Sequence, residues 1–338
     1  VRCSSSFCLR THEFRAMSNK SRKELQANCI ASFGTGCTIM CFTNPLDTLR
    51  CRWQVSGSSA QSLFGMMSMI AREEGIWKGF WRPGLPPNVL AMGIAIGGRN
   101  GFYPTMRDSI GAMYGGTEKV GAGGMFAAGL FAGMTGYFLA SPLLQVKTQM
   151  QVEAGKLSAE GLYLTGARVG LAPTYSGSFD AFSKLASSGY ASGGFVGGIQ
   201  SLWRGAGVIV GRGAAVSSSQ LCAYDMTKTV LKDRGFQDGP LLHFIASQVG
   251  AVCCTTFSMP LDIVLTVYTS AQTLGGERKI LYGSGGPFRC ASAMFRKDGP
   301  LVFFRGWVPA FMRISPTTTS SFFLYEQLRR LVGIGYLD

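Results

Sequence analysis

The stretch SPLLQVKTQMQ, residues 141–151, closes an apolar segment in which 27 consecutive residues, Val120–Val146, carry no charge. Two other stretches close apolar segments in the same way, NPLDTLRCRWQ at 44–54 and MPLDIVLTVYT at 259–269. A proline removes a backbone hydrogen bond from a helix and bends it, so each stretch indicates a helix that bends close to its end. Three endings of one kind indicate one structural unit used three times.

The spacing of further landmarks supports an internal repeat of about 100 residues. A glycine and a tyrosine recur 19 residues apart in each copy; the three pairs are Gly84 and Tyr103, Gly205 and Tyr224, and Gly306 and Tyr325. Each copy holds two apolar segments; in chain order the six cover 29–44, 85–98, 120–146, 205–224, 241–261 and 306–325. About 20 residues cross a bilayer. We therefore predict an all-α membrane protein with six transmembrane helices in three tandem repeats, pseudo-three-fold symmetry and short helices in the connecting loops.

The repeats divide the chain into four parts. Residues 1–24 form a basic, Arg- and Ser-rich tail or a mitochondrial targeting segment. The three repeats cover 25–115, 116–235 and 236–338. The second repeat is the longest, with 82 residues between its proline and tyrosine landmarks. Its Gly/Ser-rich part, residues 155–198, is predicted to be a flexible insertion in the loop.

Composition narrows the possible functions. Only 15% of residues are charged, 46% are hydrophobic, and the net charge is +14, so anionic partners are expected. No basic-aromatic recognition module for nucleic acid is visible. The chain has ten cysteines at irregular spacing, expected to be free thiols, and only two histidines, which leaves little material for zinc sites or Ser-His-Asp catalysis. We predict no enzyme activity, no catalytic residues, no metal and no cofactor.

The three proline stretches resemble the signature of the mitochondrial carrier family, P-x-[DE]-x-x-[KR]-x-[KR]-x-Q. The first repeat matches it throughout, with Pro45, Asp47, Arg50, Arg52 and Gln54. The second departs from it at Leu144, where the acid belongs, and the third at Leu265 and Thr269, where the base and the glutamine belong. The resemblance covers residues 25–333. It implies a multi-pass protein of the mitochondrial inner membrane that moves a small metabolite by alternating access.

The resemblance also implies a gate that closes the matrix side of a central pore. In this family the acid of each odd-numbered helix pairs with the base of the next, which gives Asp47–Lys147 and Asp262–Arg50 here. The third pair would join two leucines, so no unpaired charge is left buried. The glutamines resemble braces beneath the pairs. The predicted matrix gate consists of Asp47, Arg50, Gln54, Leu144, Lys147, Gln151, Asp262 and Leu265.

A second gate is implied on the cytoplasmic side, with the pairs Asp225–Arg329 and Glu326–Arg107. The third pair departs from the pattern, because Pro104 stands where the acid that should meet Lys228 belongs. The alternative interpretation is that these charges are simply solvated at helix ends.

Arginines inside the apolar segments mark the expected substrate site. Arg212 and Arg313 each lie 12 residues before their tyrosine landmark, about 18 Å along a helix and hence near the middle of the bilayer. Arg99 lies only four residues before its tyrosine, where it could also extend to the membrane surface. Two guanidinium groups facing one cavity favour a small, doubly charged anion. The predicted substrate-binding residues are Arg99, Arg212, Gln220 and Arg313.

Three particular stretches of sequence narrow the resemblance further. GRNGFYPTMR (98–107) and SSSQLCAYDMTK (217–228) look like the oxaloacetate branch of the carriers, and RISPTTTSSFFLYEQ (313–327) is similar to that branch and to 2-oxoglutarate carriers. This implies exchange or proton-coupled transport of oxaloacetate, sulfate, malonate or related dicarboxylates. A 2-oxoglutarate/dicarboxylate exchanger is one alternative. The other is a carrier-derived structural or accessory subunit of a larger inner-membrane complex with little or no transport.

The family also binds cardiolipin at basic-glycine turns before its even-numbered helices, where backbone amides and a base hold phosphate. A proline interrupts the turn of the first repeat. The predicted lipid-binding residues are Arg82, Gly84, Trp203, Arg204, Gly205, Phe304, Arg305 and Gly306.

Overall fold

The computed structural model describes residues 4–55, 62–113, 122–237, 239–274, 276–283 and 285–331, except for the side chains of residues 4–24 and of some single helical residues. Six long helices account for most of this chain: α1 (Ser4–Val55), α3 (Leu85–Met113), α4 (Ala122–Glu153), α6 (Ala206–Asp233), α7 (Pro240–Leu274) and α10 (Trp307–Leu331). The described residues include no strand, only one isolated bridge between Leu157 and Tyr163. The all-α fold class predicted from the repeats is confirmed.

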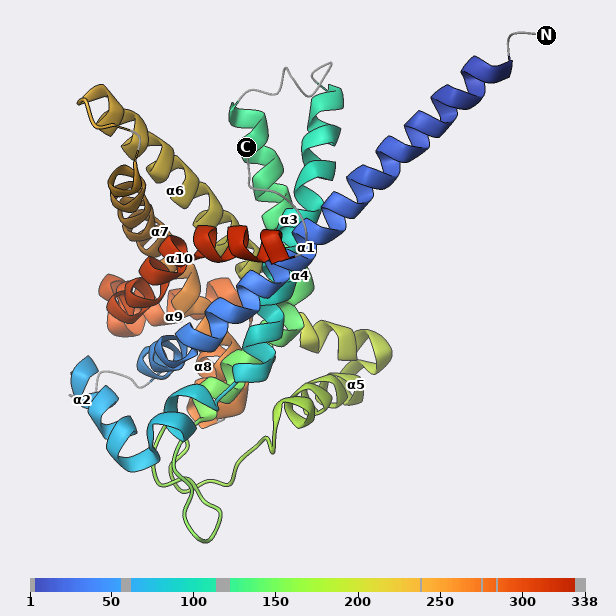
Figure 1. Cartoon of the computed structure of the whole chain (residues 1–338). Coiled ribbons are helices and arrows are strands. Elements are labelled where there is room, and N and C mark those ends of the chain that lie inside the picture. The colour runs from blue at the N-terminus through green and yellow to red at the C-terminus, as the bar shows by residue number, and fades with distance from the viewer. Residues whose placement is uncertain are drawn as a thin grey trace.

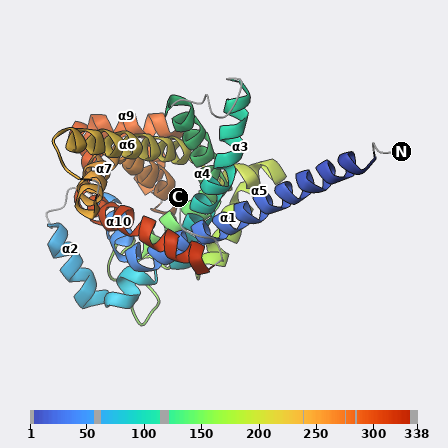
Figure 2. The same cartoon turned by 45° about the horizontal axis from the view of Figure 1, so that its top comes forward.

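The six long helices form a closed ring in chain order. Helix α1 packs against α3 and α10, and the ring continues from α3 to α4, α6, α7 and back to α10. The pairs α3–α4 and α6–α7 lie side by side in both views (Figures 1 and 2). Each repeat contributes two neighbouring helices, so the sequence repeat becomes a repeat in space.

Length and composition alone mark two of the described helices as able to cross a membrane, over Phe126–Glu153 and Phe244–Ala271. Six spans are predicted from the repeats, so hydropathy alone recovers only part of the ring. Other ring helices carry arginines along their length, which lower their mean hydropathy; Arg99, Arg212 and Arg313 are examples.

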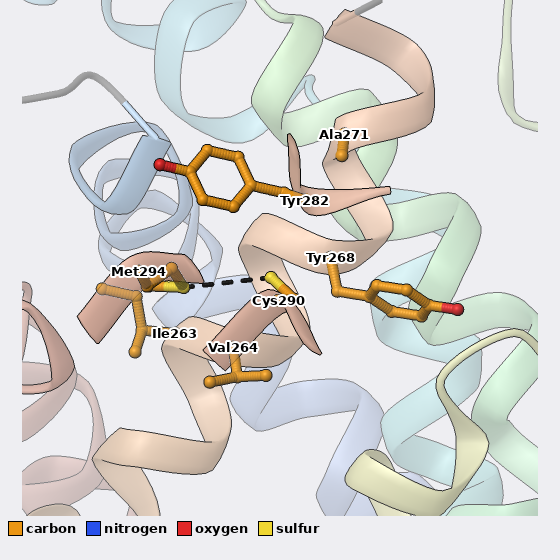
Figure 3. Packing of buried hydrophobic residues seen from close by; sticks show 7 residues of the cluster. All are labelled: Ile263, Val264, Tyr268, Ala271, Tyr282, Cys290 and Met294. Carbon is orange, nitrogen blue, oxygen red and sulfur yellow. Dashed lines mark hydrogen bonds between the residues drawn. The ribbon is translucent and has the colours of Figure 1, made fainter. Parts of the chain in front are cut away.

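Short helices connect the long ones at one end of the ring, which we call the loop end. The first repeat contributes α2 (Leu63–Met69), η1 (Ile70–Glu74) and η2 (Trp77–Trp81); the second α5 (Ser178–Leu202); the third α8 (Gly276–Tyr282), α9 (Gly286–Asp298) and η4 (Pro300–Phe304). Helix α9 packs on α7 through Ile263, Val264, Cys290 and Met294 (Figure 3). These contacts fix the loop end of the third repeat to α7.

The predicted flexible insertion, residues 155–198, is partly wrong. Residues 178–198 belong to helix α5, and α5 buries Ala181 and Leu185 against Val146 of α4. Alanine and leucine four residues apart lie on one helix face, so a composition rich in glycine and serine still supplied an apolar face. The helix breaks at Gly193 and Gly194, where Gly194 has φ 62°.

Glycine occupies the three landmark positions for one structural reason. Each begins a ring helix with a positive φ, 64° at Gly84, 79° at Gly205 and 91° at Gly306. Each also lies against the first helix of a neighbouring repeat. A Cβ on Gly84 would stand 3.1 Å from Gln151 Cγ of α4, and one on Gly306 would stand 3.2 Å from Gln54 Cγ of α1. Only glycine combines this backbone conformation with so close an approach at little cost.

Residues 4–24 are part of helix α1. The helix runs without interruption from Ser4, and in both views its first part extends away from the other helices (Figures 1 and 2). Pro45, Pro142 and Pro260 lie inside α1, α4 and α7, so each helix continues beyond its proline.

Candidate functional site

Near the loop end of the ring, side chains of α1, α4 and α7 form the two ion pairs that the family resemblance implies. Lys147 Nζ lies 2.6 Å from Asp47 Oδ2, and Arg50 Nη1 lies 3.0 Å from Asp262 Oδ2. Arg50 also approaches Asp47 on its own helix, with Nη2 at 3.2 Å from Oδ1. Arg50 therefore links the two carboxylates, and the pairs form one cluster across α1, α4 and α7.

The two mid-helix arginines join the same cluster. Arg212 Nε of α6 contacts Asp262 Oδ1, and Arg313 Nε of α10 lies 3.6 Å from Asp47 Oδ1. The sequence pattern treats these arginines as a group separate from the gate. In the folded chain, α6 lies beside Asp262 of α7 and α10 lies beside Asp47 of α1. The two arginines and the gate residues therefore share the same two acids.

This charge network is buried and carries excess positive charge. The side chains of Asp47 and Asp262 are only 3% and 2% exposed. Four cationic and two anionic groups leave a net charge of +2 over the described members of the network. The network comprises Asp47, Arg50, Lys147, Arg212, Asp262 and Arg313.

Two asparagines that were not predicted from the sequence, Asn44 and Asn88, form hydrogen bonds that reach Asp47 of the network. Asn88 Nδ2 donates to Asp47 Oδ2 at 3.2 Å and to Asn44 Oδ1 at 2.8 Å. Asn44 in turn donates to the carbonyl oxygen of Trp81 at 2.8 Å, and Gln151 Nε2 donates to Asn44 Oδ1 at 3.2 Å. Asn44 directly precedes the first landmark proline, and this position could have marked it as a candidate site residue in the sequence. Gln151 thus braces α1 rather than the Lys147 ammonium.

The remaining predicted gate residues lie in apolar or tightly packed surroundings. Leu144 packs against the buried alanines Ala91 and Ala95 of α3. Leu265 lies against the start of α6, with Cδ1 at 3.3 Å from a Cβ built on Gly205. Leu144 thus contacts α3, and Leu265 contacts the start of α6.

Arg99 and Gln220 lie apart from the network. Arg99 Cδ is 4.0 Å from a Cβ built on Gly133 of α4, and no described carboxylate lies within ion-pair distance of it. Gln220 packs toward Gly250 of α7, at the contact between α6 and α7. Of the predicted substrate residues, the structure brings together Arg212 and Arg313.

The predicted cytoplasmic gate is only partly described. The side chains of Asp225, Glu326 and Arg329 lie outside the described part of the chain. Arg107 is exposed and lies 3.3 Å from its neighbour Asp108. Lys228 is partly buried on α6.

The basic-glycine turns connect neighbouring repeats through their arginines. Arg204 Cζ stacks over the ring of Tyr268 at 4.4 Å, and Arg305 Cζ lies 5.6 Å from the ring of Trp53. Trp203 Nε1 donates to the Phe138 carbonyl at 3.1 Å. The remaining predicted lipid residues with side chains, Arg82 and Phe304, are exposed. Among the described residues, no group of three or more His, Cys, Asp or Glu side chains could hold a metal ion.

Comparison with known proteins identifies the class. The sequence profile described as "Mitochondrial carrier protein" matches residues 21–113, 118–235 and 236–335. Mitochondrial brown fat uncoupling protein 1 of Canis lupus familiaris is 26% identical over 326 residues, covering 94% of this chain and 95% of its own. Mitochondrial uncoupling protein 1 of Arabidopsis thaliana is 29% identical over 321 residues, covering 89% and 90%. A Danio rerio protein named dicarboxylate carrier UCP2 is 30% identical over 316 residues, covering 87% and 88%.

A closed ring of six helices, built from three repeats around a buried charge network, defines a membrane transporter. The chain belongs to the mitochondrial carrier family, as the three matched segments show. It is a multi-pass protein of the mitochondrial inner membrane and a transporter of small metabolites rather than an enzyme. The family and location expected from the sequence are confirmed.

Proposed function

We propose that this carrier moves small dianions, of the dicarboxylate or sulfate type, by alternating access. The net charge of +2 on the buried network is the observation that carries the proposal. A buried excess of positive charge is costly unless an anion neutralises it, and a dianion matches the excess. The name of the Danio rerio relative, a dicarboxylate carrier, supports the same class.

The proposed mechanism follows from the shared carboxylates. An anion bound between Arg212 and Arg313 competes with Asp262 and Asp47 for the two guanidinium groups. Once the arginines turn to the anion, each carboxylate loses one of its cations and the network that closes the loop end is weaker. Substrate binding therefore favours opening, because the anion has higher affinity for the state in which the arginines are released.

Within this class, oxaloacetate, sulfate and malonate are the proposed substrates, on the resemblance of 98–107 and 217–228 to the oxaloacetate branch. The runner-up is exchange of 2-oxoglutarate and other dicarboxylates, which 313–327 resembles equally. Arg99 and Gln220 then remain candidate contacts along the path of the substrate. The pairs at the cytoplasmic end, Asp225–Arg329 and Glu326–Arg107, are proposed to close the opposite side.

The test is uptake of labelled sulfate and oxaloacetate into cardiolipin-containing liposomes. Wild type is compared with Arg212→Ala and Arg313→Ala, and with Arg296→Ala as a matched control. Arg296 is exposed on α9 outside the network, so its loss removes the same charge without touching the site. We expect saturable uptake by wild type and control, and loss of uptake in both network variants. Equal uptake by all four proteins contradicts the proposed site.

A second candidate function comes from the names of the relatives from Canis lupus familiaris and Arabidopsis thaliana, which are uncoupling proteins. Proton conductance across the same liposomes, measured with an internal pH dye, distinguishes it. Conductance without anion uptake favours uncoupling. Neither activity in folded protein across a panel of dicarboxylates favours a structural or accessory subunit of a larger complex.

We further propose that the basic-glycine turns bind cardiolipin, a bound lipid rather than a cofactor. The turns preceding α6 and α10 begin helices and hold Arg204 and Arg305 beside them. Helix-start amides and a base suit phosphate. Native mass spectrometry should detect bound cardiolipin on wild type, and Arg305→Gln should reduce the bound fraction. An unchanged fraction would remove the turn of the third repeat from the proposal.

A further inference from the structure

The loop between α4 and α5, residues 154–177, is folded against two repeats at the loop end, and we call it the strap. In both views it runs beside the short helices of the first repeat (Figures 1 and 2). The proline and tyrosine landmarks lie 82 residues apart in the second repeat, against 58 and 65 in the others. The glycine-to-tyrosine spacing is 19 in every copy, so the extra residues lie in the connection that contains the strap and α5.

The base of the strap is fixed to its own repeat. Glu153 at the end of α4, whose side chain is 3% exposed, accepts a hydrogen bond from the backbone N–H of Thr174. Arg168 Nη1 lies 3.6 Å from Glu153 Oε1. Tyr175 donates its hydroxyl proton to Gln149 Oε1 of α4 at 2.5 Å. These contacts join the strap to α4 and do not involve the first repeat.

The middle of the strap is a hairpin with a defined shape. The backbone N–H of Ser158 donates to the Leu162 carbonyl at 2.7 Å, and that of Leu164 donates to the Lys156 carbonyl at 2.7 Å. Tyr163 is buried, which holds the hairpin against the protein. The next residue after this hairpin, Thr165, is therefore presented in a fixed position.

Thr165 connects the strap to the first repeat. Its hydroxyl accepts the backbone N–H of Lys156 at 2.8 Å and donates its one proton to Glu74 Oε1 of η1 at 2.7 Å. Glu74 is held in turn by Arg52 of α1 through two hydrogen bonds, and the side chains of this pair are 3% and 4% exposed. A buried hydrogen bond thus links the second repeat to α1 through Glu74.

The strap crosses the same two helices as one ion pair of the gate. Lys147 of α4 pairs with Asp47 of α1. Glu153 lies six residues beyond Lys147 and Arg52 lies five beyond Asp47, which is about 8–9 Å further along each helix. Two contacts in series therefore hold α1 and α4 together at the loop end.

We propose that the strap holds the first and second repeats together and slows the opening of the loop end. This proposal rests on the alternating access proposed above, in which α1 and α4 separate at that end. Separation breaks both Asp47–Lys147 and Thr165–Glu74, whereas the base of the strap stays on α4. The added barrier is one hydrogen bond, which sets a rate without blocking the motion.

A native cysteine reports the opening without any substrate. Cys51 is 0% exposed and packs with Val55, Val152 and Leu274, where the ends of α1, α4 and α7 meet. Opening of the loop end separates these helices and exposes the thiol. The labelling rate of Cys51 therefore measures how often the loop end opens.

Two variants release the strap and one serves as the control. Thr165→Val keeps the shape of the side chain and removes the donor to Glu74. Deletion of residues 156–165 removes the whole hairpin; a Cβ on Gly166 would stand 3.5 Å from Gly155 Cα, so these two glycines can be joined with little distortion. The control is Thr135→Val, which removes a hydroxyl that donates to the Phe131 carbonyl within α4.

The experiment treats the full chain and these variants, in liposomes, with N-ethylmaleimide at one fixed pH. Peptide mass spectrometry follows Cys51, and thermal unfolding checks that every protein is folded. We expect Cys51 of Thr165→Val to label about fivefold faster than wild type, because one hydrogen bond is lost. The deletion variant should label at least as fast, and the control at the wild-type rate. Equal rates in all four proteins, or an equal acceleration in the control, would overturn the strap.

A parallel measurement of sulfate uptake by the same proteins separates this proposal from the proposed function. If the labelling rates follow the expected order and no protein takes up sulfate, the strap stands and the proposed substrate class is wrong. If Cys51 is not labelled in any of the folded proteins, the loop end does not open, and both alternating access and the strap are contradicted.

Discussion

Arg313 Nε of α10 lies 3.6 Å from Asp47 Oδ1 of α1. The same carboxylate also forms an ion pair with Lys147. An arginine expected to bind substrate thus shares its partner with the gate. Competition for one carboxylate gives a direct physical link between an arriving anion and the contacts that close the pore.

Replacing Asp47 with asparagine should strongly destabilise the closed ring. The change leaves Lys147, Arg50 and Arg313 with one buried acid in place of two, and breaking a buried ion pair on one side costs about 3–5 kcal/mol. Thermal unfolding in detergent measures the loss. Asp108→Asn is the control: its pair with Arg107 is 60% and 44% exposed and is worth below about 1 kcal/mol. Equal melting temperatures of the two variants would contradict the buried network.

Replacing Arg313 with lysine should retain folding but weaken transport. The charge is kept, whereas the planar fork that binds two oxygens of an anion is lost. A hydrogen bond to a charged group is worth about 1.5–3 kcal/mol, so uptake at low substrate concentration should fall roughly tenfold or more. Initial uptake rates over a range of sulfate concentrations test this. Wild-type kinetics in the lysine variant would mean that charge alone is required.

Gly306→Ala should destabilise the junction between the first and third repeats. Gly306 has φ 91°, a conformation that costs an alanine roughly 1–2 kcal/mol, and its Cβ would press on Gln54. Gly207→Ala is the opposite case, because a Cβ there meets nothing within 4 Å on a regular helix. This control should gain up to about 1 kcal/mol. Melting temperatures that move in the same direction for both variants would refute the argument.

Thr165→Val should loosen the loop between α4 and α5. Thr165 Oγ1 donates to Glu74 Oε1 at 2.7 Å, and Glu74 also forms a two-bond pair with Arg52 at 2.6 and 2.7 Å. Valine keeps the shape but removes the donor, at a cost of about 1 kcal/mol. Limited proteolysis should cut residues 155–177 faster. Ser187→Ala, which removes a hydroxyl that donates to the Lys184 carbonyl within α5, should be cut at the wild-type rate.

Cys290 should resist alkylation below strongly alkaline pH. Burial raises the pKa of this thiol to about 12, because the thiolate would lie among Ile263, Val264 and Met294 (Figure 3). The reactive thiolate is therefore scarce at pH 8, and the labelling rate should rise about tenfold per pH unit until the pKa is reached. Peptide mass spectrometry after iodoacetamide treatment measures this. The same protein unfolded in sodium dodecyl sulfate serves as the comparison, because its thiols are then accessible. Labelling of Cys290 at pH 8 as fast in the folded as in the unfolded protein would show an accessible thiol.

Much of the fold was predictable because it depends on the spacing of residues that lie close together in the chain. The prolines, glycines and tyrosines at repeated intervals define six helices, and the ring follows chain order because consecutive elements tend to pack side by side. The identity of the paired residues, such as Asp47 with Lys147, followed from the resemblance. The helix within 155–198 was missed, since its apolar face is only a few residues wide and is masked by glycine and serine.

The sequence by itself determined the three repeats, the six helices, the family and the residues that carry charge into the membrane. Only the tertiary structure decided that Arg212 and Arg313 share carboxylates with the gate, that Asn44 and Asn88 support Asp47, and that α5 breaks at Gly193 and Gly194. Helices and repeats arise from interactions between residues close in the chain. The net charge of a buried cluster depends on which distant side chains meet, and packing of the whole ring fixes those meetings.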